Sequence, residues 1–182
     1  MAYANLKRTE DAERCLRRAL RADPTNAAAH FNLGLLTAEL GRTDEAEQAL
    51  RRALKFDPKM AAAAYNLGVL LGRRSVREAA HWCAEAYRLA PGEPKYAHAA
   101  AFYLAKQGEA AAAAEVLRAI IDRKQADADC YFLLAEILRR SGQAKDAAAV
   151  YRQALERFHL PEQVKAELRQ TIKELESTGP RG

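Results

Sequence analysis

The sequence predicts an all-α fold in which antiparallel helix pairs stack side by side as an α-solenoid. Three observations lead to this prediction. Strong helix formers such as Ala, Leu, Arg and Glu are heavily used, whereas the 182-residue chain has only 9 Gly and 6 Pro. A set of small and apolar residues recurs at a fixed period. Gly and Pro stand at corresponding places in successive copies, which indicates short turns between helices.

The first recurring set marks one helix of each pair. It consists of Ala46, Leu50, Ala53 and Pro58, with spacings of four, three and five residues. The same spacings recur at Ala12, Leu16, Ala19 and Pro24, and again at Ala79, Cys83, Ala86 and Pro91. Looser copies are Ala113, Leu117, Ile120 and Gln125, then Ala147, Tyr151, Ala154 and His159. The leading alanines recur at steps of about 34 residues, with a single step shortened by one, which makes a generic helical bundle a poor explanation.

A second set marks the other helix of each pair. Leu33-Gly34 recurs as Leu67-Gly68, and Ala100-Ala101 and Leu134-Ala135 take the same place in later copies. Gly41, Gly108 and Gly142 stand between the paired helices, and the third copy has lost one residue there and reads Arg73-Arg74-Ser75. Small residues such as Gly34, Gly68, Ala46 and Ala79 suit places where two helix backbones approach closely.

This pattern resembles the tetratricopeptide repeat (TPR) family, most closely from His30 to Pro58. The family aromatic at the fourth position is matched by Tyr131 but not by His30, Ala64 or Ala97. The resemblance implies a right-handed superhelix and a protein that binds other proteins. We expect a truncated first TPR at 1–24, TPRs at 25–58, 59–91 (one residue short), 92–125 (degenerate) and 126–160, a capping helix at 161–177 and a frayed tail at 178–182.

Helix bounds follow from the same register. Inner helices are expected near 27–40, 60–73, 94–107 and 128–140, and outer helices near 10–22, 44–56, 76–90, 110–124 and 144–158. Ser75 and Glu78 have capping-box spacing, which predicts a helix start at about Val76. Thr9 and Thr43 are candidate N-caps of the equivalent helices.

The two ends of the array differ. Met1 falls in the middle of an inner helix, and Tyr3 matches the family aromatic there, so the first repeat lacks its beginning. Three explanations are open: the chain is a fragment, its true start lies upstream, or a partner or self-association covers this end. At the other end Pro161 opens a helix. Its apolar stripe, formed by Val164, Leu168, Ile172 and Leu175, indicates a cap on the last repeat, with a partner-binding amphipathic helix as the alternative.

The resemblance implies a concave groove lined by the inner helices. The candidate groove residues are Phe31, Asn32, Leu35, Tyr65, Asn66, Val69, Lys95, His98, Phe102, Lys106, Phe132 and Arg139. The amides of Asn32 and Asn66 offer a donor and an acceptor to the backbone of an extended peptide, or else bond within the solenoid. The aromatic rings are anchors for apolar side chains, or else pack between inner helices. The apolar first half and basic second half predict a partner segment with apolar residues followed by acids.

A carboxylate clamp of the kind found in chaperone-binding TPR domains is disfavoured. Asn66 and Lys95 match two of its positions, but Phe31, Leu35 and Ala99 stand at the others. A carboxylate placed against these groups would lose most of its charge-assisted hydrogen bonds.

Residues that would carry chemistry do not form a pattern. The sequence has no phosphate-binding glycine loop. Three widely spaced cysteines (Cys15, Cys83 and Cys130) suggest neither disulfides nor a metal site but core thiols in a reducing compartment. Cys83 and His81 are two residues apart, so their side chains diverge on a helix. We therefore expect no cofactor, no metal and no enzyme activity, and a cytoplasmic location unless an upstream targeting segment is missing.

Charge and hydropathy limit the partners. A net charge of +5 comes from 29 basic and 24 acidic residues, a mild excess that does not indicate nucleic acid. No run of about 18 apolar residues suggests a membrane span. The sequence thus predicts a non-catalytic scaffold. The alternatives are the repeat portion of a larger enzyme or assembly factor, and an α-solenoid that binds nucleic acid.

Overall fold

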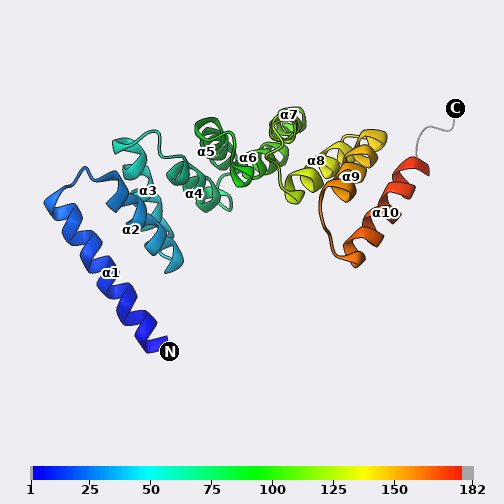
Figure 1. The fold of residues 1–182 in the computed structure, drawn as a ribbon. Helices are drawn as coiled ribbons and strands as arrows, with labels where there is room; N and C mark the ends of the chain where they lie inside the picture. Colours follow the sequence, from blue (N-terminus) through cyan, green and yellow to red (C-terminus); the bar gives the residue numbers. More distant parts are fainter. Residues whose placement is uncertain (1, 178–182) are drawn as a thin grey trace. The chain divides into compact units, whose positions relative to one another are not determined.

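The computed structural model describes residues 2–177, with side chains from Thr9 onwards, and this part of the chain consists of helices and turns without a strand (Figure 1). The helices are α1 (Ala2–Ala22), α2 (Ala27–Glu39), α3 (Thr43–Phe56), α4 (Ala61–Leu71), α5 (Val76–Leu89), α6 (Pro94–Gln107), α7 (Ala110–Asp122), α8 (Ala128–Arg140), α9 (Ala144–Arg157) and α10 (Glu162–Ser177). Apart from the start of α1, the predicted bounds of the paired helices agree with these to within two residues.

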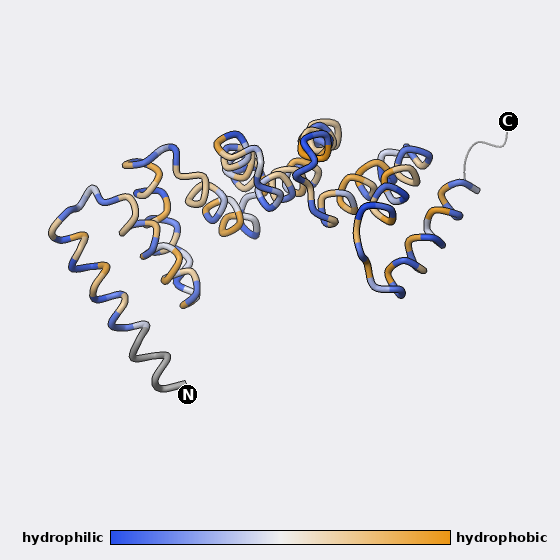
Figure 2. The backbone as a smooth tube through the Cα atoms, in the orientation of Figure 1, coloured by the Kyte–Doolittle hydropathy of each residue, from blue (hydrophilic) through white to orange (hydrophobic). Residues whose placement is uncertain are grey.

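The chain divides into two compact units, residues 1–89 and 90–182. In the N-terminal unit α2 packs against α3 and α4 against α5, while α3 contacts α4 and α1 contacts α2. In the C-terminal unit the pairs are α6 with α7 and α8 with α9, with further packing of α7 on α8 and α10 on α9. Figure 2 shows apolar and polar residues alternating around the helices of both units, as expected for helices with one buried face.

Close approach within a pair explains the small residues. A Cβ atom added to Gly34 would lie 2.8 Å from Leu50 Cγ, and one added to Gly68 would lie 2.5 Å from Cys83 Sγ. Ala101 and Ala135, which take the same place in α6 and α8, are completely buried. The expectation that these positions bring two helices together is confirmed.

Left-handed glycines make three of the four turns within helix pairs. Gly41, Gly108 and Gly142 have φ values of +73°, +97° and +76°, a region that side-chain-bearing residues rarely adopt. The shortened turn, between α4 and α5, has no such residue. There the Ser75 hydroxyl oxygen accepts a hydrogen bond of 3.2 Å from the Glu78 backbone N–H, and α5 begins at Val76 as predicted.

Other helix caps differ from the prediction. Thr43 is the first residue of α3, whose N-cap residue is Arg42 and has no side-chain capping bond. Side-chain caps occur instead at Asn26, which accepts from Ala29 N–H at 2.8 Å, and at Asp127, which accepts from Cys130 N–H at 3.0 Å. The chain thus caps the inner helices α2 and α8 rather than the outer helix α3.

The first helix is the main correction to the sequence analysis. An inner helix, a turn and an outer helix at 10–22 were expected, but α1 is continuous from Ala2 to Ala22, so Thr9 lies within a helix and is not an N-cap residue. Lys7 stands one repeat before Gly41. Without a glycine at this place, no left-handed turn interrupts the helix. The Tyr3 side chain, Met1 and the predicted tail at 178–182 lie outside what the structure describes.

A continuous α1 leaves one of its faces uncovered. Ala12, Cys15 and Ala19 are exposed, although the counterparts of the two alanines one repeat later, Ala46 and Ala53, are completely buried. The expectation of three core thiols is therefore wrong for Cys15. It is confirmed for the other two cysteines, which are buried and free.

At the C-terminal end, α10 begins directly after Pro161 and packs against α9. Ile172 and Leu175 of its apolar stripe are buried, and Val164 and Leu168 are half-buried. The amphipathic stripe is confirmed.

Candidate functional site

The inner helices of the N-terminal unit bury one face and present another. In α2 and α4 the buried faces point towards the outer helices and include Gly34 and Gly68. The predicted groove residues lie off these faces: Asn32 is exposed, Val69 is 45% exposed, and Phe31, Leu35, Tyr65 and Asn66 are half-buried. The predicted apolar side chains of this unit are therefore accessible, at least in part, on one side of the α2–α4 layer.

The two predicted asparagines differ in their bonding. The Asn66 side-chain N–H donates to the Ala62 carbonyl oxygen at 2.7 Å, which is the intramolecular alternative left open above. The Asn32 side chain makes no hydrogen bond to the described part of the chain and is exposed. Its whole amide group is therefore open to a partner, whereas the half-buried Asn66 has one N–H already in use.

In the C-terminal unit, α6 and α8 enclose a cavity of about 420 Å³ together with the start of α7. Its lining residues are Phe102, Ala105, Lys106, Ala110, Leu133, Glu136, Ile137, Arg140 and Ser141. Phe102 is 42% exposed, and its ring centroid lies 5.1 Å from that of Tyr103 and 5.7 Å from Lys106 Nζ. This cavity has an apolar floor and a charged rim, which is the composition typical of a small ligand or peptide anchor site.

The charged rim includes an acidic residue, Glu136, which pairs with neighbouring arginines. Glu136 accepts hydrogen bonds from Arg139 Nε at 2.8 Å and Arg140 Nε at 2.7 Å. The bond from Arg139 is the main reason why the pKa of Glu136 is lowered. The predicted basic half is therefore partly neutralised at Arg139, whereas Lys106 makes no ion pair with the described residues.

The other predicted residues of this unit lie on the same helices. Lys95 is exposed, with Nζ 5.0 Å from the Tyr96 ring centroid. His98 of α6 and Phe132 of α8 are half-buried. Leu133 and Ile137 form much of the cavity floor. Neither was among the candidate groove residues, although Leu133 takes the repeat position of Asn32 and Asn66.

The structure does not support a catalytic role for Cys83. Burial raises the pKa of its thiol to about 12, so that the thiolate is strongly suppressed at neutral pH. His81, two residues earlier, contacts the Trp82 ring edge-on at 5.0 Å instead. Within residues 2–177, no three His, Cys, Asp or Glu side chains gather as metal ligands would.

Comparison with known proteins identifies the architecture. The sequence matches the family described as tetratricopeptide repeat over residues 1–61, 38–94 and 98–159. The chain belongs to the tetratricopeptide repeat family. Together with the stacked helix pairs, this match makes it an all-α TPR solenoid protein, and proteins of this family are generally non-catalytic scaffolds that bind other proteins.

Solved TPR structures resemble the chain in fold. A crystal structure of MamA aligns with a TM-score of 0.74 at 22% identity, covering 90% of this chain and 94% of that one. YrrB, described as a TPR protein with an unusual peptide-binding site, aligns with a TM-score of 0.69 at 17% identity and covers 88% of both chains. PilF of Pseudomonas aeruginosa aligns with a TM-score of 0.69 at 21% identity, covering 96% of this chain and 84% of that one. No curated protein matches the sequence.

The helices of the described region are also unsuited to crossing a bilayer, because none of them is both long and apolar enough.

Proposed function

We propose that this TPR protein is a non-catalytic scaffold that binds an extended peptide segment along the outward faces of its inner helices. The observation that carries the proposal is the exposure of Val69 and Phe102, at 45% and 42%. These residues take the same position in successive inner helices. Exposed apolar side chains that recur at one repeat position are suited to contact with a partner.

The neighbouring side chains favour a particular partner chemistry. In the N-terminal unit Phe31, Leu35 and Tyr65 accompany Val69, and Asn32 offers an amide to a peptide backbone. In the C-terminal unit Phe102 is accompanied by Lys106. These contacts support a segment with apolar residues followed by acidic ones.

A peptide array with fluorescence polarisation of the strongest binder tests this proposal. We expect segments of this kind to be enriched and the double substitution Val69→Ala and Phe102→Ala to weaken binding at least about tenfold, a typical effect of truncating apolar anchors. Leu40→Ala is the matched control, since Leu40 is 41% exposed but lies in the turn after α2. Equal losses in both variants, or an array without such enrichment, would refute the proposal.

We further propose that the uncovered face of α1 allows self-association. Ala12, Cys15 and Ala19 are exposed there although the repeat pattern makes these positions suited to helix packing. Light scattering coupled to size exclusion should show a concentration-dependent rise in mass that Ala12→Arg abolishes. A strictly constant monomer mass for the native sequence would count against self-association.

A cytoplasmic location is also proposed. Its support is that the three cysteines are free thiols, which is usual in reducing compartments. Cell fractionation checks this location.

A further inference from the structure

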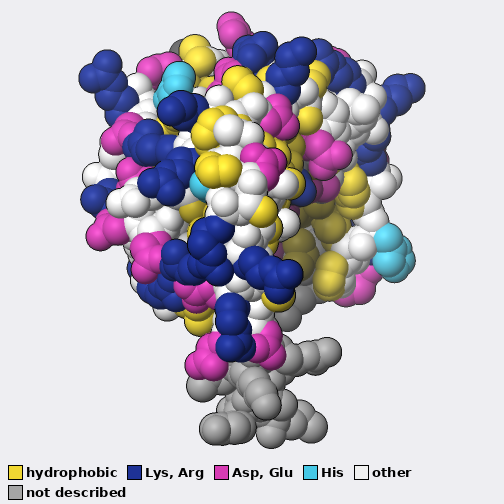
Figure 3. Space-filling view, turned by 90° about the vertical axis from the view of Figure 1, so that its left-hand side faces the viewer, with side chains coloured by type: hydrophobic (Ala, Val, Ile, Leu, Met, Phe, Trp, Pro, Cys, Tyr) yellow, Lys and Arg dark blue, Asp and Glu magenta, His cyan; other side chains and the backbone are white. Residues whose placement is uncertain are grey.

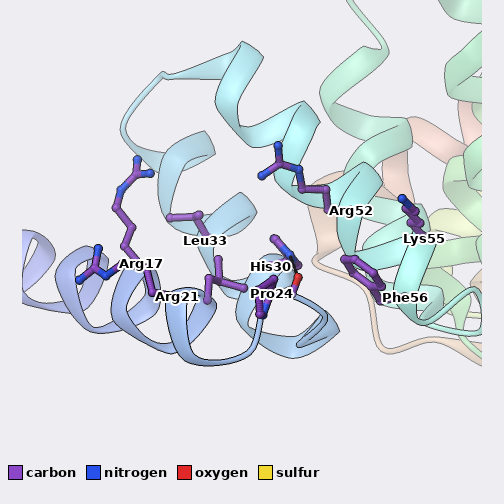
Figure 4. A pocket seen from close by; sticks show the side chains of 9 residues that line it. Arg17, Arg21, Pro24, His30, Leu33, Arg52, Lys55 and Phe56 are labelled. Carbon is purple, nitrogen blue, oxygen red and sulfur yellow. Dashed lines mark hydrogen bonds between the residues drawn. The ribbon is translucent and has the colours of Figure 1, made fainter.

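A second cavity lies in the N-terminal unit, at the junction of α1, α2 and α3 (Figure 4). It has a volume of about 430 Å³, and its lining residues are Arg17, Leu20, Arg21, Pro24, His30, Leu33, Arg52, Lys55 and Phe56. His30 and Leu33 belong to the buried face of α2, which points towards the outer helices. The cavity is therefore separate from the outward inner-helix faces on which the proposed function rests.

The cavity has four cationic residues and no acidic one in its lining. Arg17 is paired, because its guanidinium lies 2.7 Å from Glu13 and 2.9 Å from Glu45. Arg21, Arg52 and Lys55 have no carboxylate partner among residues 9–177, and Lys55 Nζ instead lies 5.7 Å from the Phe56 ring centroid. Figure 3 shows Lys and Arg side chains interspersed with Asp and Glu side chains on the face that it presents. Three unneutralised cations at one cavity strongly favour an anionic ligand.

His30 supplies an independent indication of a ligand. The residue is buried, with only 4% of it exposed, and its ring stacks on Phe56 with centroids 5.6 Å apart. Nε2 lies 2.9 Å from the Pro24 carbonyl oxygen, which can only accept, so Nε2 carries the proton. In the neutral ring Nδ1 is then an acceptor, and it has no partner in the described region. A buried acceptor without a donor is unfavourable and suits a ligand that carries an N–H group.

The C-terminal unit contains the corresponding cavity, which shows that the scaffold does not require these cations. It lies between α7, α8 and α9, has a volume of about 450 Å³ and includes Asp122, Gln153 and Glu156 in its lining. These residues take the positions of Arg21, Arg52 and Lys55 three repeats later. The lining of this corresponding cavity also includes Lys124 and Arg157, so its acidic and basic residues balance. The excess of cations is therefore a local property of the first cavity.

We propose that the α1–α3 cavity binds an acidic segment of a partner protein. Carboxylates of the segment pair with Arg21, Arg52 and Lys55, an apolar side chain rests on Leu20, Leu33 and the 38%-exposed Phe56, and a backbone N–H donates to His30 Nδ1. A small inorganic anion would satisfy the cations but leave the apolar floor uncovered. A peptide supplies the anion, the apolar group and the N–H together.

The test uses the whole chain and a short fluorescein-labelled peptide in which leucines alternate with glutamates. A second peptide carries glutamine in place of every glutamate, and inorganic phosphate serves as a competitor. The cavity variant is Arg21→Gln, Arg52→Gln and Lys55→Gln. The matched control removes the same charge elsewhere, by Arg77→Gln, Arg118→Gln and Lys145→Gln, since these three exposed cations also have no carboxylate partner in the described part.

We expect the glutamate peptide to bind and the cavity variant to weaken it at least tenfold, with less than a twofold change in the control variant. The glutamine peptide should not bind, and phosphate should compete only weakly. Hydrogen exchange should show peptide-dependent protection at the C-terminal turns of α1 and α3 but not at α7 and α9, which line the corresponding cavity of balanced charge.

Three results would overturn the inference: absence of binding by the glutamate peptide, equal losses in the two triple variants, or competition by phosphate at comparable concentrations. The double substitution Val69→Ala and Phe102→Ala separates this site from the inner-helix surface. It should leave binding of the glutamate peptide unchanged, and a loss there with no effect of the cavity variant would place the peptide on the other site.

Discussion

Single atoms decide how closely the helices of a pair approach. At Gly68 an added Cβ would meet Cys83 Sγ at 2.5 Å and also two backbone atoms, Cys83 N at 3.0 Å and the Ala79 carbonyl oxygen at 3.1 Å. At Gly92 the atoms met by a Cβ belong to the flexible end of Gln125, the nearest at 3.0 Å. The two glycines thus differ in whether their neighbours can move aside.

This difference predicts the effect of replacing each of the two glycines by alanine. Gly68→Ala should lower the free energy of unfolding by about 1–3 kcal/mol, the usual range for overpacking, even though alanine is the better helix former. Gly92→Ala should change it by less than about 0.5 kcal/mol. Chemical denaturation followed by circular dichroism measures both, and a neutral Gly68→Ala would mean that α4 and α5 separate more easily than their packing indicates.

The three thiols should react very differently. Cys15 is exposed, whereas burial raises the pKa of Cys83 and of Cys130 to about 12. We expect a thiol reagent to modify one cysteine rapidly in the native protein at pH 8 and the other two only after unfolding, because the thiolate is the reactive form. Mass spectrometry of the labelled peptides identifies the sites. Protection of Cys15 that disappears on dilution would instead reveal association through α1.

Outer helices are linked by ion pairs that recur from one repeat to the next. Arg42 makes two 2.8 Å hydrogen bonds to Glu13 and Arg17 reaches Glu45 at 2.9 Å, which joins α1 to α3. Arg51 reaches Glu78 at 2.7 Å, which joins α3 to α5. In the described region the backbone of α1 comes close only to that of α2, so these bonds are an important part of its attachment.

The attachment of α1 should depend on pH. Hydrogen bonds from Arg42, and next from Arg17, lower the pKa of Glu13 from 4.5 to about 2. A carboxyl whose pKa is lower in the folded state stabilises the fold above its unfolded pKa, so this contribution is present at pH 7 and lost as pH falls from 4.5 towards 2.

Glu13→Gln should therefore lower the Tm by about 2 °C at pH 7, a small effect because the pairs are near the surface, and by progressively less below pH 4. Thermal melts over this range measure the difference between native and variant proteins. Glu10→Gln is the control, since Glu10 is exposed and makes no ion pair to the described residues. A difference that does not shrink on acidification would mean that Glu13 acts through packing rather than charge.

At the scale of the whole molecule, stability should be distributed along the array. Within each described unit, a helix packs mainly against its neighbours in the sequence, as is general for solenoid proteins. Local disturbances should then remain local, because few contacts connect distant repeats.

Hydrogen exchange of Gly68→Ala tests this distribution. Protection should fall most in α4 and α5 and less in α3, while α8 and α9 of the other unit keep protection close to that of the native sequence. A uniform fall through all helices would show instead that the chain unfolds as one cooperative body.

The repeat period, with its small residues and turn glycines, was enough to place the paired helices. These signals act through neighbouring backbone groups, so they can be recognised along the chain. The continuous α1 also depends on a local residue. The repeat register predicted a turn near Lys7, but no glycine is present there to form it. Caps such as Ser75 were recognisable for the same reason.

Side-chain partnerships were decided only by the tertiary structure. Arg42 pairs with Glu13 of α1, and Arg51 of α3 pairs with Glu78 of α5. Arg21 and Lys55, which take the same position in successive repeats, face one cavity because α1, α2 and α3 come together there. Whether a charge is paired or free depends on atoms contributed by other helices, and a sequence pattern does not contain those distances.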